Sequence, residues 1–91
     1  MPMNDAFRWN DWNRDHVAVH GVLPEEAEYV VNHATPPYPE MIGDEKWRVR
    51  GQTSTGRYLQ VIFVIEEEGY YVIHARGLTD REKKRLRRRR R

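Results

Sequence analysis

The stretch RYLQVIFVIEE, residues 57–67, decides the fold of this chain. It is a nearly continuous apolar run of strand length, which is typical of a central strand covered on both faces. Before it, KWRVRGQT (46–53) alternates between apolar and mostly basic side chains, and after it YYVIHAR (70–76) runs back. Because short turns at STG and EEG connect these segments, we predict three strands in an antiparallel meander.

Two helices are expected before the meander. NDWNRDHVAVHG (10–21) begins with residues that cap helices, and Gly21 can end it in the left-handed conformation. LPEEAEYVVNH (23–33) has proline at its first helical position and glutamates in its first turn, and its alanine and valines form an apolar stripe. FRW (7–9) is a short aromatic segment that we expect to form an edge strand.

After the meander, Thr79 and Glu82 have the spacing of a capping box and begin a helix through the basic residues. Segment 35–45, with three prolines and a glycine, is expected to lack regular structure. The predicted fold class is α+β: a small antiparallel sheet, made of a three-stranded meander plus a possible short N-terminal strand, with two N-terminal helices and a basic C-terminal helix. We assign residues 1–86 to a single domain and residues 87–91 to a basic tail that frays.

Charge is divided unevenly along the 91 residues. Residues 81–91 hold nine basic residues and one acidic residue, a net charge of +8, whereas residues 1–80 hold seven basic and thirteen acidic residues, a net charge of −6. A block of like charge is usually solvated, and it can also bind nucleic acid or an acidic protein. Both interpretations of the basic end stay open at this point.

The composition excludes several classes of site. The chain has no cysteine, which removes disulfides, thiolate zinc sites and cysteine nucleophiles together and fits a reducing cytoplasm. No apolar run reaches the length of a membrane span, and the first residues lack the basic start and apolar stretch of a signal peptide. We therefore expect a cytoplasmic protein without a membrane segment.

Four histidines are the first candidates for chemistry. His16 and His20 are four residues apart, a spacing that stacks both imidazoles on one face of a helix. Zinc needs three or four ligands, but His33 and His74 are scattered and Val17 stands where a His-Glu-x-x-His motif has glutamate. A metal site is therefore not expected, and a role in packing or at the helix end is the alternative to catalysis.

Two arginines are the second candidates. Arg57 begins the central strand and Arg76 ends the next one, so an antiparallel pair brings them to one end of the sheet. Two converging guanidiniums are suited to binding phosphate, and we expect His20 within reach of them. Ordinary solvated charge, or pairing with Asp80 or Glu82, is the alternative. The chain shows no nucleophile triad, glycine-rich phosphate loop or pair of catalytic carboxylates.

The ordered set of segments resembles the BrnT family of bacterial type II toxins. The similarity covers nearly all of the chain and rests on FRWN, WNRDHVAVHGVLPEEAEYVV, GQTSTGRYLQVIFVI and YYVIHARGLTDREKKR. The resemblance implies a RelE-like fold, in which helices pack on a small antiparallel sheet. It also implies a ribonuclease, or an inhibitor of translation that acts through RNA, and a ribbon-helix-helix antitoxin as partner.

The resemblance also points to site residues. The family's working residues map onto His20 of HG, Arg57 of GR, Arg76 of AR and Glu82 of the last helix, and Lys46 stands where the family often has arginine. We assign nucleic-acid binding to the basic side chains that surround Glu82 in the sequence: Arg81, Lys83, Lys84, Arg85, Arg87 and Arg88.

These observations lead to one expected function and two alternatives. The expected function is that of a bacterial toxin, a metal-independent endoribonuclease without cofactor, in which His20 is the acid or base and Arg57 and Arg76 bind phosphate. RNA and an antitoxin are the expected partners, and a homodimer is possible. The alternatives are a toxin-like module that only binds an antitoxin or nucleic acid, and a metal-dependent hydrolase that uses His16 and His20.

Overall fold

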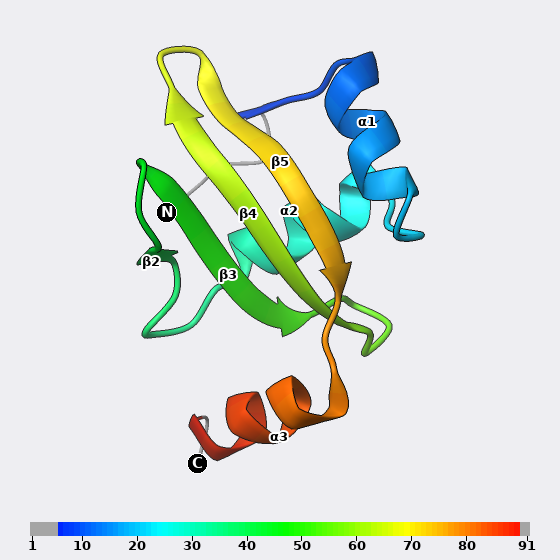
Figure 1. Ribbon diagram of the computed structural model, residues 1–91, viewed down its shortest axis with the longest axis vertical. Helices are drawn as coiled ribbons and strands as arrows, with labels where there is room; N and C mark the ends of the chain where they lie inside the picture. Colours follow the sequence, from blue (N-terminus) through cyan, green and yellow to red (C-terminus); the bar gives the residue numbers. More distant parts are fainter. Residues whose placement is uncertain (1–5, 90–91) are drawn as a thin grey trace.

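The computed structural model describes residues 6–89 and contains the predicted meander. Strands β3 (Lys46–Gln52), β4 (Tyr58–Glu66) and β5 (Gly69–Gly77) are antiparallel neighbours, and β4 is the central strand of a five-stranded sheet with the order β1-β5-β4-β3-β2. Figure 1 shows α2 behind this sheet, α1 beside β5, and α3 beyond the end at which β3 and β5 finish. The α+β class is therefore confirmed.

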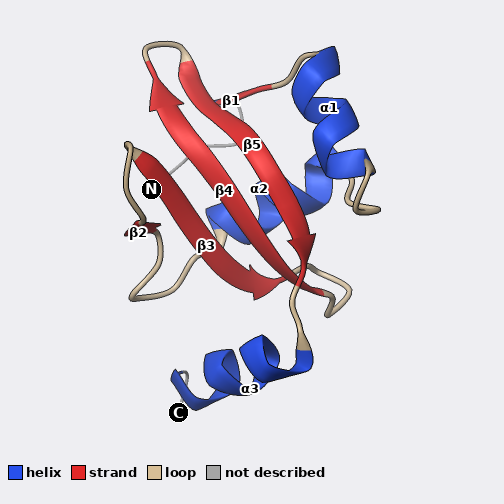
Figure 2. Cartoon of the chain, viewed as in Figure 1, coloured by secondary structure: helices blue, strands red, loops and turns tan. Residues whose placement is uncertain are grey.

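Two short strands complete the sheet and correct its predicted type. Strand β1 (Phe7–Arg8) forms at the expected aromatic segment, but it runs parallel to β5. Strand β2 (Glu40–Met41) pairs with β3 inside a segment predicted to be irregular (Figure 2). The sheet is thus mixed, and the prediction of a purely antiparallel sheet is wrong. Strands of two residues are too short to produce a periodic pattern, and their pairing depends on neighbours distant in sequence.

Helix α1 (Asp11–Ala18) is capped as expected at both ends. The Asn10 side chain accepts from the backbone N–H of Asn13 at 3.1 Å, and the Asn13 side chain accepts from the N–H of Asn10 at 2.7 Å. The helix stops three residues before Gly21, whose φ is +71°. The N–H of Gly21 donates to the carbonyl of Ala18 at 2.9 Å and the N–H of Val22 to the carbonyl of Val17 at 3.1 Å, which is the bond pattern of a helix end closed by a left-handed residue. The prediction that Gly21 ends this helix is therefore confirmed. His20 lies in the turn that closes the helix, directly before Gly21.

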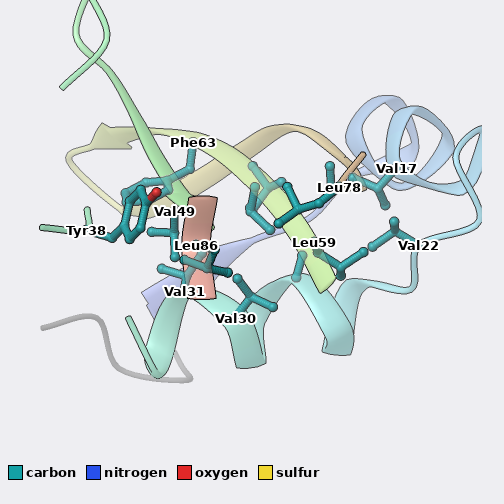
Figure 3. Close-up of a cluster of buried hydrophobic side chains, with 14 residues drawn as sticks. Val17, Val22, Val30, Val31, Tyr38, Val49, Leu59, Phe63, Leu78 and Leu86 are labelled. Carbon is teal, nitrogen blue, oxygen red and sulfur yellow. The ribbon is translucent and has the colours of Figure 1, made fainter. Parts of the chain in front are cut away.

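Helix α2 (Pro24–Asn32) forms the layer that covers one face of the sheet. The backbone N–H of Leu23 donates to Glu26 Oε1 at 3.0 Å, so the acidic first turn caps the helix although leucine offers no side-chain acceptor. Its predicted stripe of Ala27, Val30 and Val31 is buried. Figure 3 shows the two valines in one cluster with side chains of β3 and β4, and the sheet residues of this core are Val49, Leu59, Val61, Phe63, Val72 and Ala75.

Helix α3 (Asp80–Arg89) begins at the predicted capping box. The backbone N–H of Thr79 donates to Glu82 Oε1 at 2.8 Å, and the N–H of Glu82 donates to Thr79 Oγ1 at 3.2 Å. Leu86 is 2% exposed and joins the core cluster. The domain boundary at residue 86 and the fraying of the tail stay predictions, and residues 90–91 lie outside the described part. Within residues 6–89, no helix is long and apolar enough to cross a membrane.

Opposite the core lies a second face of the sheet, which we call the open face. Alternation along the strands directs one set of side chains to α2 and the other set away from it. Register partners share a face, so the open face of the meander includes Lys46, Arg48, Arg50, Gln60, Ile62, Val64, Tyr71, His74 and Arg76. Among these, Gln60 is buried, at 5% exposure. Its mixture of cations, histidine and tyrosine makes it the candidate surface for function.

The turn between β4 and β5 provides a test of how the N-terminal segment docks. A Cβ on Gly69, whose φ is +137°, would lie 1.9 Å from the carbonyl oxygen of Ala6, the residue before β1. Gly69→Ala should therefore lower the free energy of unfolding by about 2 kcal/mol or more, measured by urea denaturation.

Gly43→Ala is the matched control, because Gly43 has a φ of +108° but nothing within 4 Å of the added Cβ. Both variants carry the strain of a positive φ, so the excess loss at Gly69 reports the contact with Ala6. Equal losses in the two variants would contradict close docking of this segment.

Candidate active site

The open face presents three rungs that cross the meander. Each rung has one residue from β3, one from β4 and one from β5. In order from the end nearest α3 they are Arg50–Gln60–Arg76, Arg48–Ile62–His74 and Lys46–Val64–Tyr71. The β3 positions are all basic, the β4 positions are polar or apolar, and the β5 positions are arginine, histidine and tyrosine. The chemistry-bearing side chains therefore gather along β5, next to α1.

A β-bulge sets the alignment along β5. Ile62 pairs with His74 and Phe63 pairs with Val72, so Ile73 is the extra residue. Tyr71 and His74 are three positions apart, an odd offset that would put them on opposite faces of a regular strand. The extra residue restores them to the same face, which is how bulges re-aim side chains near functional sites.

His20 and His74 meet where the turn after α1 approaches β5. Their ring centroids are 5.3 Å apart and the planes are inclined by 66°. Burial lowers the pKa of His74 below its usual 6.5, and the nearby charges of His20, Arg76 and His16 lower it further. His74 is therefore a neutral imidazole at pH 7, able to accept a proton.

Arg76 lies next to this pair and is held by the first turn of α3. Its Nη1 donates to Glu82 Oε1 and its Nη2 to Glu82 Oε2, both at 2.9 Å. Arg50 Nη2 donates to the same Oε2 at 3.1 Å, and Arg50 Nε donates to Gln60 Oε1 at 2.8 Å. One carboxylate thus links two arginines of the end rung to α3.

Glu82 is a constant negative charge in this arrangement. The hydrogen bonds from Arg76 are the largest cause that lowers its pKa to about 2, and the backbone N–H of Thr79 and the charge of Arg50 act in the same direction. A carboxyl group with such a pKa is a poor proton carrier near neutral pH. Its position suits it to orient Arg76.

Arg57 does not join Arg76 in a clamp. Pairing of Leu59 with Gly77 brings the two arginines to the same end of the sheet, as expected. However, Arg57 Nη1 donates to the carbonyl of Gly21 at 2.8 Å and to Glu26 Oε1 on α2 at 3.0 Å. Its guanidinium therefore faces the α2 side, whereas Arg76 lies on the open face. In the described structure, Arg57 anchors the turn that carries His20.

The other predicted residues are more distant from the histidine pair. Lys46 is exposed on the third rung, separated from the Arg76 rung by that of Arg48. On α3, Lys83 and Arg87 lie over the ring of Tyr58, 5.8 and 5.9 Å from its centroid. The remaining predicted nucleic-acid-binding residues form an exposed stripe at helical spacing: Arg81, Lys84, Arg85 and Arg88.

The described residues provide no ligand geometry for the metal-site alternative. Among residues 6–89, no three His, Asp or Glu side chains are grouped so that they could hold a metal ion. His16 Nδ1 lies 3.1 Å from the carbonyl oxygen of Trp12, and its ring stacks on the indole of that residue. A pocket of about 720 Å³ lies elsewhere, between α2 and the β3–β4 turn, and its lining includes His33 and Arg89.

Sequence reasoning missed the role of His74 and Arg50. His74 and Arg76 are two residues apart on a strand, and this alternation is a signal that could have placed both on one face. The proximity of His20 had no such signal, because it depends on where α1 packs.

Comparison of the chain with protein-family models, with curated proteins and with solved structures returned no match.

The charge on Glu82 should make its contribution to stability depend on pH. Because its pKa is about 2 in the folded protein against 4.5 for the free group, its stabilisation is present above pH 4.5 and is lost as the pH falls toward 2. Glu82→Gln should lower the free energy of unfolding by about 2 kcal/mol at pH 7. The deficit relative to the unmodified protein should shrink at pH 2.5, measured by urea denaturation.

Glu66→Gln is the control, because Glu66 pairs with Arg8 at a site where both side chains are more than 40% exposed. Its loss should stay below about 0.5 kcal/mol. A Glu82→Gln deficit that is equal at the two pH values would contradict the assigned pKa.

Proposed function

We propose that this chain is a toxin of a bacterial type II toxin–antitoxin system and that it cleaves RNA without a metal ion. The observation that carries the proposal is the pair of His20 and His74 on the open face, beside the guanidinium of Arg76. Attack of the RNA 2′-hydroxyl on the adjacent phosphodiester is aided by a base, an acid and a positive charge, and two imidazoles and a guanidinium can supply these three. The resemblance of the ordered segments to BrnT toxins supports the same class.

In the proposed reaction, neutral His74 accepts the proton of the 2′-hydroxyl as the 2′-oxygen forms its bond to phosphorus. The bond from phosphorus to the 5′-oxygen breaks, and His20 donates a proton to that oxygen. The products are a 2′,3′-cyclic phosphate and a 5′-hydroxyl. Since His74 must be neutral, the rate should rise with pH through a pKa below 6.5.

Arg76 stabilises the negative charge that develops on the phosphoryl oxygens. Glu82 accepts from both terminal nitrogens of Arg76, so an incoming phosphate shares the guanidinium with Glu82 or competes with it for these donors. We assign Glu82 as a positioning residue, Arg50 as a second cation at the same carboxylate, and Lys46 as a distant auxiliary cation. Arg57 is a positioning residue for the turn of His20.

The exposed basic stripe of α3 supplies affinity that is independent of sequence. It extends from the side of the helix opposite Leu86, so phosphates can reach it without displacing the core contact. A ribbon-helix-helix antitoxin that covers this stripe and the open face would block RNA, which is the role we propose for the partner. Cytoplasmic location and a homodimer belong to the same proposal.

Removal of either histidine should abolish the chemistry. His74→Ala and His20→Ala should each lower the single-turnover rate of RNA cleavage about 10²–10⁴-fold, because each removes one proton-transfer step. The assay follows a labelled RNA in EDTA and identifies the 2′,3′-cyclic phosphate end.

His33→Ala is the matched control, because this exposed histidine lies on α2 away from the open face and should leave the rate unchanged. RNA that is bound but never cleaved by the unmodified protein would favour the non-enzymatic module. Cleavage that survives in both histidine variants would show a different catalytic site or a contaminating nuclease.

Neutralisation of the α3 stripe should weaken RNA binding and leave the bound-state rate nearly intact. Each phosphate contact to single-stranded nucleic acid contributes a slope of about −0.7 to log K against log[salt]. Replacing Arg81, Lys84, Arg85 and Arg88 together by glutamine should therefore flatten the slope by up to about 3. The rate at saturating RNA should stay within a few-fold, because uniform binding does not lower the barrier.

Arg8→Gln, which removes an exposed cation paired with Glu66 and Glu68 at the other end of the sheet, serves as the comparison. An unchanged slope in the α3 variant would exclude the stripe from RNA binding.

A further inference from the structure

An aromatic cluster continues the candidate active site along β5. Trp12, in the first turn of α1, is 50% exposed, and its indole stacks on His16 with centroids 3.7 Å apart and planes inclined by 25°. The ring of Tyr71 is nearly parallel to the indole, at 21°, with centroids 6.2 Å apart. Two aromatic planes from different elements thus share one orientation.

The capping residues at the start of α1 also hold this aromatic cluster in place. Tyr71 donates its hydroxyl to Asn10 Oδ1 at 3.1 Å, and that oxygen also accepts from the N–H of Asn13 in the capping box. The tyrosine ring is therefore held before any ligand arrives. Preorganised aromatic rings lose little side-chain entropy on binding.

A stacked aromatic–histidine pair four residues apart is by itself only a helix contact. Tyr29 and His33 form such a pair on α2, with centroids 3.9 Å apart and planes inclined by 19°. The pair on α1 differs in its surroundings, because Tyr71 lies beside it. On the open face, Tyr71 is also the next β5 position after His74.

We infer that Trp12 and Tyr71 form a stacking subsite for one nucleobase of single-stranded RNA, adjacent to the phosphate position at His74 and Arg76. The inference rests on the proposed function and names a part of the substrate that it holds. Tyr71 and His74 are three positions apart along β5, a span of at most about 10 Å, so the subsite and the phosphate position are neighbours on the open face. Single-stranded RNA is commonly held by stacking on aromatic side chains.

The charge distribution explains why stacking is needed here. Most cations lie on α3 and at the end rung, whereas the Tyr71 rung has only Lys46, two strands away on β3. Helix α1 itself carries Asp11 and Asp15 against Arg14. Electrostatic attraction for the RNA is therefore strongest at the α3 end and weaker beside Trp12 and Tyr71. A base–aromatic contact requires no positive charge and accepts every base, so the subsite would position the strand without strict sequence preference.

The test uses a 2′-O-methyl RNA oligonucleotide, which has no 2′-hydroxyl proton and cannot be cleaved by the proposed route. Trp12→Ala and Tyr71→Ala should each weaken its binding at least about five-fold by fluorescence anisotropy, whereas Trp12→Phe and Tyr71→Phe should retain most of the affinity. Tyr29→Ala, which breaks the equivalent pair on α2, should change the affinity less than two-fold.

A second measurement varies the RNA, and its first arm uses only the unmodified protein, so that arm does not depend on the folding of a variant. Single abasic positions are moved along the oligonucleotide, and one position should weaken binding to the unmodified protein but not to Trp12→Ala. The inference is overturned if no abasic position matters, if Tyr29→Ala weakens binding as much as Trp12→Ala, or if folded Trp12→Ala binds within two-fold of the unmodified protein.

The two proposals fail in different ways. If the oligonucleotide binding shows the expected losses but unmodified RNA is never cleaved, the subsite is supported and the ribonuclease proposal is wrong. If the histidine variants lose cleavage while the aromatic variants bind normally, the ribonuclease proposal is supported and the stacking subsite is wrong.

Discussion

Leu59, Val61 and Phe63 of β4 are almost completely buried, and covering them is the constraint on which the rest of this small domain depends. Each such side chain contributes about 1.5–3 kcal/mol when it leaves water, and a chain of 91 residues has few others of this kind. Helix α2 supplies the cover with Val30 and Val31. Because α2 occupies that face, the alternate side chains of the same strands point away from the core and are available for function.

The open face is kept in order by groups that neutralise one another. Glu82 binds Arg76 and Arg50 and, through the capping box with Thr79, fixes the start of α3. The same contact therefore anchors the basic helix and orients the arginine nearest His74. This double role joins stability and proposed catalysis: a variant of Glu82 changes the docking of α3 and the freedom of Arg76 together, which is why its effects on folding and on RNA have to be measured separately.

Two local devices bring the proposed chemistry to one place. The bulge at Ile73 returns Tyr71 to the face of His74 and Arg76, and the turn after α1 brings His20 to the same row. On the other side of the sheet, the guanidinium of Arg57 donates to the carbonyl oxygens of Gly21 and His20 and so holds that turn in place. The proposed site is thus a row along β5, with an acid–base pair in its middle, cations at one end and aromatic rings at the other.

Local patterns in the sequence determined the helices, their capping residues, the order of the meander strands and the burial of Ala27, Val30 and Val31, because periodicity and capping act over a few residues. They also identified His20 and Arg76 as candidates, and strand order brought Arg57 and Arg76 to one end of the sheet. Only the tertiary structure decided which face each arginine occupies, where the bulge lies, that β1 and β2 join the sheet, and that His74 meets His20. Those outcomes depend on contacts between segments that can lie more than 60 residues apart, such as that of Tyr71 with Asn10, and no local pattern specifies them.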